Sequence, residues 1–121
     1  VETAFVWTEG EMHMLARLGR VKITGRSTSI SLERSIGHAI ADNGDICGAT
    51  MSISENGDIS VATLWQNDQI IDLNTMIGKS NREIVLVSAE GINRDGEIVA
   101  TGYRVEDHDS TQTRIYRLVP R

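Results

Sequence analysis

The chain repeats two short sequence patterns. Residues 4–7 (AFVW) recur as residues 62–65 (ATLW), an offset of 58 residues, and residues 40–46 (IADNGDI) recur as residues 92–98 (INRDGEI), an offset of 52 residues. A repeat of about 50 residues is typical of a supersecondary unit that buries its apolar face against copies of itself. We therefore predict one domain over residues 1–121, built from two repeats at about 1–57 and 58–121.

Turn signals predict antiparallel β-structure. Asn43-Gly44, Asn56-Gly57 and Asp95-Gly96 each lie between alternating apolar segments, and these dipeptides favour the positive φ values of tight hairpins. Glu9-Gly10 and Asn67-Asp68 fit further tight turns after the two tryptophans. No long segment shows helical periodicity. The predicted strands are Thr3–Trp7, Glu11–Leu15, Ser35–Ala41, Asp45–Ser52, Asp58–Gln66, Gln69–Asn74, Ile84–Ile92, Glu97–Val105 and Thr113–Val119.

The strands between residues 35 and 74 form one continuous four-strand antiparallel meander, which is the pattern of a β-propeller blade. Residues 19–32 indicate a long loop with room for a short strand at Arg20–Thr24. The sequence thus predicts an all-β fold of antiparallel four-strand meanders, arranged as two β-propeller-like repeats. Two blades cannot close a ring, and five strands are left over at the ends. We therefore expect self-association, as a trimeric ring or as a dimer that exchanges terminal strands.

Charge and composition narrow the classes of function. The formal net charge is −5 and no basic block stands out, so the footprint of a nucleic-acid binder is missing. The apolar runs are too short for a membrane span, and the chain shows no signal peptide. The single Cys47 excludes an intrachain disulfide and fits a small buried hydrophobe.

The repeats resemble the bacterial HAF-type repeats, whose pattern runs Ala-Phe-x-Trp, Asp-Leu-Gly/Asn-x-Leu and Ala-x-x-Ile-Asn-x-x-Gly-x-Ile-Val-Gly. Residues 4–7, 72–76 (DLNTM) and 89–99 (AEGINRDGEIV) match these three elements. The chain departs from the pattern at Ala41, in place of Asn, and at Ala100, in place of Gly. The resemblance implies a propeller-like β-repeat and an extracellular location. It implies no reaction and no catalytic residues.

Few residues indicate chemistry. His13, His38 and His108 show no metal-ligand spacing with one another or with Cys47, so we expect no metal and no cofactor. His38 fits a partly buried sheet position. His108, between two aspartates on a polar loop, fits a solvated turn or a surface ligand for a cation. No nucleophile elbow and no phosphate-binding glycine loop is present, so no catalytic residue is assigned.

The two tryptophans are the main recognition candidates. Trp7 and Trp65 could stack on sugar rings or anchor a protein partner, although their shared repeat position favours packing between blades. With His108 they make up the predicted ligand-binding residues. The predicted function is a binding or structural module that recognises a carbohydrate or a protein partner in a groove between blades. The alternatives are a glycan-acting hydrolase with loop carboxylates, and an interaction scaffold without a small ligand.

Overall fold

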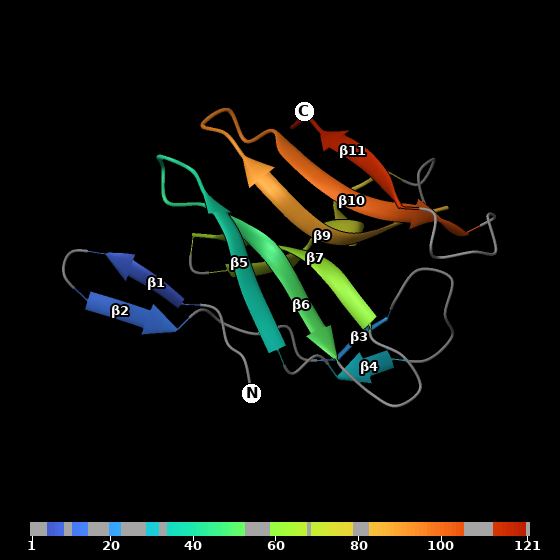
Figure 1. Cartoon of the computed structure of the whole chain (residues 1–121), viewed down its shortest axis with the longest axis horizontal. Helices are drawn as coiled ribbons and strands as arrows, with labels where there is room; N and C mark the ends of the chain where they lie inside the picture. The colour runs from blue at the N-terminus through green and yellow to red at the C-terminus, as the bar shows by residue number, and fades with distance from the viewer. Residues whose placement is uncertain are drawn as a thin grey trace.

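A computed structural model describes residues 5–8, 11–14, 20–22, 29–31, 34–52, 59–67, 69–78, 83–105 and 113–120. These residues form eleven β-strands and one short 3-10 helix (Figure 1). The N-terminal strands are β1 (Phe5–Thr8), β2 (Glu11–Met14), β3 (Arg20–Lys22) and β4 (Ser29–Ser31). The middle elements are β5 (Arg34–Ile40), β6 (Ile46–Ser52), β7 (Ile59–Gln66), β8 (Gln69–Asp72) and the helix η1 (Leu73–Thr75). The C-terminal strands are β9 (Ile84–Ile92), β10 (Ile98–Arg104) and β11 (Arg114–Leu118).

The predicted all-β class and the four-strand meander are confirmed. One antiparallel sheet has the order β5-β6-β7-β8, and a second has the order β9-β10-β11. The hairpins β1–β2 and β3–β4 each form a two-stranded sheet. The described residues close neither a barrel nor a propeller ring. Instead, β9 lies across β5, β6 and β7, so that the second sheet packs against the first (Figure 1).

The two turns at the repeat positions have the same backbone geometry. In the turn 41–45, the N–H of the fourth residue donates to the carbonyl of the first at 2.9 Å, and the N–H of the first donates to the carbonyl of the fifth at 2.8 Å. Both corresponding distances in the turn 93–97 are 3.1 Å. The fourth residues, Gly44 and Gly96, have φ of +95° and +81°, as three-residue hairpin loops require. The positive φ predicted for these two turns is confirmed, whereas Asn56-Gly57 lies outside the described residues.

Both sheets carry a β-bulge at the same repeat position. Between Gly37 and Ala39, β5 has one residue more than its partner β6, which leaves His38 outside the pairing. The strand β9 has an extra residue opposite β10 at Glu90, 52 residues later, and a second one at Val87. His38 is exposed rather than partly buried as predicted, because the bulge removes it from the ladder.

The matching turns and bulges show how the repeat is phased. The hairpin β9–β10 repeats β5–β6, and β11 takes the place of β7 beside it. The predicted division at 57/58 instead falls between β6 and β7, inside the four-stranded sheet. In the described part of the chain, no strand beyond β11 takes the place that β8 has in the first sheet.

Small apolar residues fill the contact between the sheets. Ala62, Ala89 and Ala100 are 0% exposed and join one core cluster with larger side chains from both sheets. The other buried members of this cluster are Cys47, Leu64, Leu73, Leu86 and Ile98. Since methyl groups separate the strands only slightly, the backbones of the two sheets approach closely.

Each hairpin also has a glycine beside a bulge: Gly48 lies beside the bulge at His38, and Gly102 lies beside a second bulge of β9 at Val87. A Cβ atom added to Gly48 in β6 would lie 1.9 Å from the carbonyl oxygen of Ile36 in β5. A Cβ atom added to Gly102 in β10 would lie 2.1 Å from the carbonyl oxygen of Val85 in β9. Backbone atoms cannot move aside as a flexible side chain can, so both sites exclude any side chain.

We predict that Gly48→Ala lowers the free energy of unfolding by about 1–3 kcal/mol, because the added methyl group forces β5 and β6 apart. Gly91→Ala is the matched control, since a Cβ atom there meets nothing within 4 Å. Urea denaturation of both variants measures the difference. Equal midpoints for Gly48→Ala and the unsubstituted chain would contradict the close approach of the two strands.

Candidate functional site

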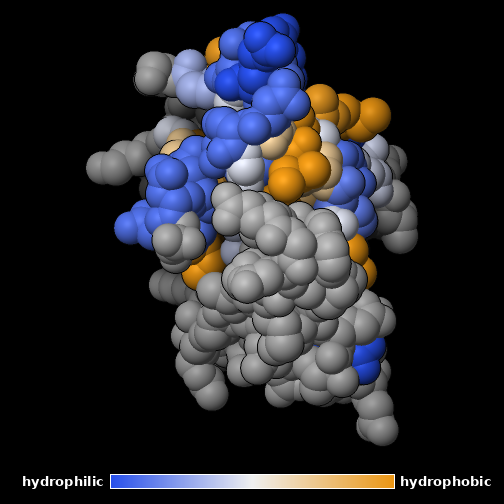
Figure 2. All heavy atoms as spheres, turned by 90° about the vertical axis from the view of Figure 1, so that its left-hand side faces the viewer, coloured by the Kyte–Doolittle hydropathy of each residue, from blue (hydrophilic) through white to orange (hydrophobic). Residues whose placement is uncertain are grey.

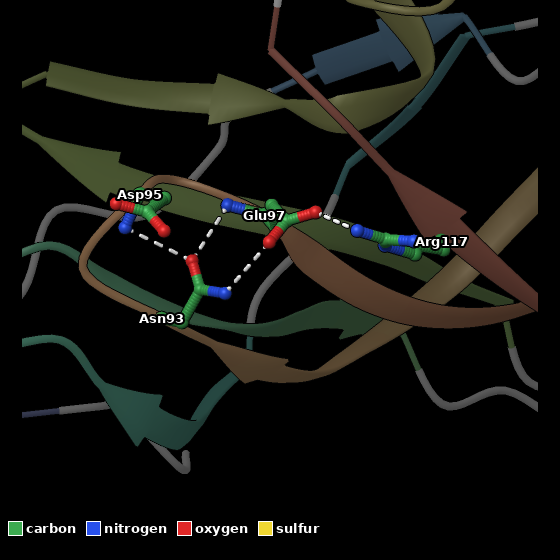
Figure 3. Close-up of polar contacts among 4 residues, drawn as sticks. All are labelled: Asn93, Asp95, Glu97 and Arg117. Atoms are coloured by element: carbon green, nitrogen blue, oxygen red, sulfur yellow. Dashed lines mark hydrogen bonds and ion pairs between the residues drawn. The ribbon is translucent and has the colours of Figure 1, made fainter.

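The turn 93–97 is held by one asparagine side chain (Figure 3). The Oδ1 atom of Asn93 accepts hydrogen bonds from the backbone N–H groups of Asp95 and Glu97, both at 3.0 Å. Its Nδ2 donates to the Oε1 of Glu97 at 3.0 Å, and Arg117 of β11 contacts the other oxygen of that carboxylate. The hydrogen bonds from Asn93 and Arg117 hold the pKa of Glu97 below its usual value. The network thus ties the turn to β11.

The turn 41–45 has a related network built from different positions. Asn43 accepts a hydrogen bond from the N–H of Asp45 at 3.0 Å, and the carboxylate of Asp45 accepts one from Gln66 of β7 at 2.9 Å. In both copies the acidic residue after the turn glycine is therefore bound by the third strand of its sheet. Both carboxylates are therefore engaged in hydrogen bonds within the fold.

An ion pair connects the two turns at one end of the molecule. Arg94 and Asp42, which occupy the same repeat position, lie 3.5 Å apart. Their side chains are 76% and 82% exposed, so the pair contributes little to stability. Figure 2 views this end, whose described part is largely hydrophilic with a few hydrophobic side chains between.

The side-chain amide of Asn74 joins the two sheets, because it binds a backbone N–H and a carbonyl of β9 as a neighbouring strand would. Its Oδ1 accepts from the backbone N–H of Leu86 at 2.7 Å, and its Nδ2 donates to the carbonyl of Leu86 at 3.0 Å. Asp72 holds this amide in place by accepting from the Asn74 backbone N–H at 2.9 Å and from Nδ2 at 3.0 Å. Leu73 between them is 2% exposed in the core. The segment 72–74 therefore fastens β9 to the first sheet and occupies backbone groups on its outer edge.

The predicted recognition residues have different outcomes. Trp65 is 6% exposed and packs with Ile46 and Ile70, which fits the packing role. Trp7 lies in β1 opposite Met12, and nothing further is described of it. His108 lies outside the described residues. The assignment of these three residues to ligand binding stays a prediction.

The groups with shifted pKa values do not form a catalytic arrangement. Burial raises the pKa of Cys47 to about 11, and its thiol lies 3.6 Å from the carbonyl oxygen of Ala89. The predicted role of Cys47 as a small buried hydrophobe is confirmed. Burial also raises the pKa of Asp72, partly offset by the hydrogen bonds from Asn74. Among the described residues, no group of three or more His, Cys, Asp or Glu side chains could hold a metal ion.

The unpaired side of the second sheet is the feature that sequence reasoning did not locate. In the described residues β11 pairs with β10 alone, so its other edge has no neighbouring strand. The register also sets Ile115 opposite Thr101 and Arg117 opposite Val99, which places these four residues on one face of the sheet. We call this set the outer face. Ile115 is 76% exposed and Val99 is 44% exposed.

Comparisons with known proteins give no relative. No protein-family model, curated protein or solved structure matches the chain. The resemblance to HAF-type repeats therefore remains a hypothesis. No helix in the described residues is long and apolar enough to cross a membrane.

We predict that Trp65→Ala lowers the free energy of unfolding by about 3–5 kcal/mol, because it leaves a cavity beside Ile46 and Ile70. Trp65→Phe is the control, since it retains most of the apolar volume and should cost less. Far-UV circular dichroism, which reports the backbone, measures the thermal unfolding of both variants. A stable Trp65→Ala protein would show that the indole ring is not a core group and would favour its recognition role.

We predict that Asp72 makes stability depend on acid pH. Its pKa is raised in the folded state, so its contribution to stability is fully present below the pKa of the unfolded chain and is lost as pH rises through the folded pKa. Asp72→Asn keeps an oxygen for Asn74 and removes the charge, so it should gain stability relative to the unsubstituted chain as pH rises from about 3 to 7. Asp42→Asn, at a side chain 82% exposed, is the control for loss of one negative charge. Parallel stability curves for the Asp72 variant and the unsubstituted chain would refute the buried charge.

Proposed function

We propose that this protein is a protein-interaction module that binds an extended segment of a partner polypeptide along the edge of β11 that does not face β10. The observation that carries the proposal is the difference between the two sheets. The strands β9, β10 and β11 repeat β5, β6 and β7, but the place beside β11 that corresponds to β8 is unfilled among the described residues. An exposed strand edge is a template for pairing, and adding a strand to it is a recurrent mode of peptide recognition.

The other edge of the same sheet supports this choice. On β9, the side chain of Asn74 already occupies the backbone N–H and carbonyl of Leu86, which blunts that edge. β11 has no such hook in the described part of the chain. Binding by strand addition is therefore directed to β11, and main-chain hydrogen bonds supply affinity without a deep pocket.

The hydrolase alternative needs two carboxylates that converge on one cleft. The two carboxylates with shifted pKa values, Asp72 and Glu97, are each bound by an asparagine of their own segment. These contacts explain both side chains structurally. No observation on the described residues favours a glycan-acting enzyme over the interaction module.

A synthetic peptide tests the proposal. We predict that a fluorescein-labelled peptide with the sequence of residues 69–76 (QIIDLNTM), which spans β8 and η1, binds the intact protein with a saturable rise in anisotropy. A peptide with Ile71→Pro is the control, because proline cannot donate to a β-ladder. Hydrogen exchange should slow at residues 113–120 on binding and stay unchanged at residues 34–40. No saturable binding, or protection at β5 instead of β11, would refute the proposal.

A further inference from the structure

The outer face of the second sheet corresponds to a face that is covered in the first sheet. The paired residues Ile40 and Ile46 flank one turn, and Ile92 and Ile98 flank the equivalent turn. Each residue of β6 therefore corresponds to the residue of β10 that lies 52 positions later, as Cys47 corresponds to Val99. Cys47 is 0% exposed because β9 and β10 pack on it, whereas Val99 is 44% exposed. The same protein surface thus occurs twice, once covered and once open.

The neighbouring strands give the same correspondence. Cys47 faces Leu64 in the first sheet, and Val99 faces Arg117 in the second. One pair further along each ladder, Ala62 of β7 corresponds to Ile115 of β11. Ala62 is 0% exposed and Ile115 is 76% exposed. The first sheet therefore provides a template, within this chain, for what the outer face accepts: the apolar face of another β-repeat of the same kind.

We infer that the outer face binds a second copy of this chain, through the β1–β2 hairpin of that copy. In the template, Leu118 and Tyr116 are among the residues by which the second sheet packs on the first. Leu118 faces Ile98 as Trp65 faces Ile46, so Leu118 and Trp65 hold equivalent positions. The AFVW and ATLW repeat equates Trp65 with Trp7 of β1. Strand β1 thus corresponds to β11, which packs the second sheet on the first.

The sequence of the hairpin agrees with this role. The register sets Phe5 opposite Met14 and Trp7 opposite Met12, and all four residues are apolar. The corresponding face of the first sheet is already used inside its own chain, since Thr63 and Trp65 are 0% and 6% exposed. A contact between two different faces is heterologous, and identical units joined in this way close into rings or extend. The contact involves the outer face and not the edge of β11, so it stands apart from the proposed strand addition.

Sedimentation velocity on blocked variants tests the inference. The unsubstituted chain should self-associate at concentrations up to about 100 µM, which is the range of moderate protein affinities. Ile115→Lys blocks the outer face and Met12→Lys blocks the hairpin, so each should sediment as a monomer. A mixture of the two should form a dimer that stops at two chains, because one open face of each kind remains.

Two matched controls locate the contact. Ile40→Lys changes an apolar residue of β5 that is 59% exposed. His13→Lys changes the hairpin at the position opposite Val6 instead of the Trp7–Met12 pair. Both variants should assemble like the unsubstituted chain. Unreactive Cys47 thiols in every variant show that the core is intact. A monomeric unsubstituted chain, loss of assembly in Ile40→Lys, normal assembly of Met12→Lys, or no dimer in the mixture would each overturn the inference. A monomeric chain that still binds the 69–76 peptide would leave the proposed function standing.

Discussion

The close contact of two sheets through small side chains is the constraint on which the structure depends. Ala62, Ala89 and Ala100 leave little space between β9 and the strands beneath it, so a larger residue at any of them would separate the layers. The bulges at His38 and Glu90 recur at the same repeat position, and each interrupts the pairing of the first strand of its sheet. Because this geometry occurs in both copies, one sheet can serve as a template for reading the other.

The segment 72–74 makes the contact between the two sheets specific. An apolar contact between sheets is non-directional, whereas the amide of Asn74 fits one N–H and one carbonyl, those of Leu86. Asp72 orients the amide, and the burial of its carboxylate is a cost that raises its pKa. At an offset of 58, Met14 and Ala16 stand in the places of Asp72 and Asn74. The residues of this hook therefore do not recur in the first hairpin.

Much of the fold could be predicted from local sequence signals. Asn43-Gly44 and Asp95-Gly96 marked their turns, because few residues other than glycine adopt the required positive φ. Alternation located most strands within a few residues. The sequence could not place β4 or η1, which are short, and it did not reveal the bulge that exposes His38, since an extra strand residue leaves no compositional trace. A blade pattern describes one sheet, so the sequence could not show that β9 lies across β5, β6 and β7.

The candidate site was missed for a related reason. Exposure of Ile115 and Val99 depends on which sheet has a neighbour, and a residue pattern is the same whether or not that neighbour exists. The signal lies in the difference between the copies, where Cys47, Ala62 and Leu64 become Val99, Ile115 and Arg117. A face that must pack permanently would not carry a charge at its centre. Apolar residues beside an arginine fit the binding face that we infer, because interfaces are enriched in both.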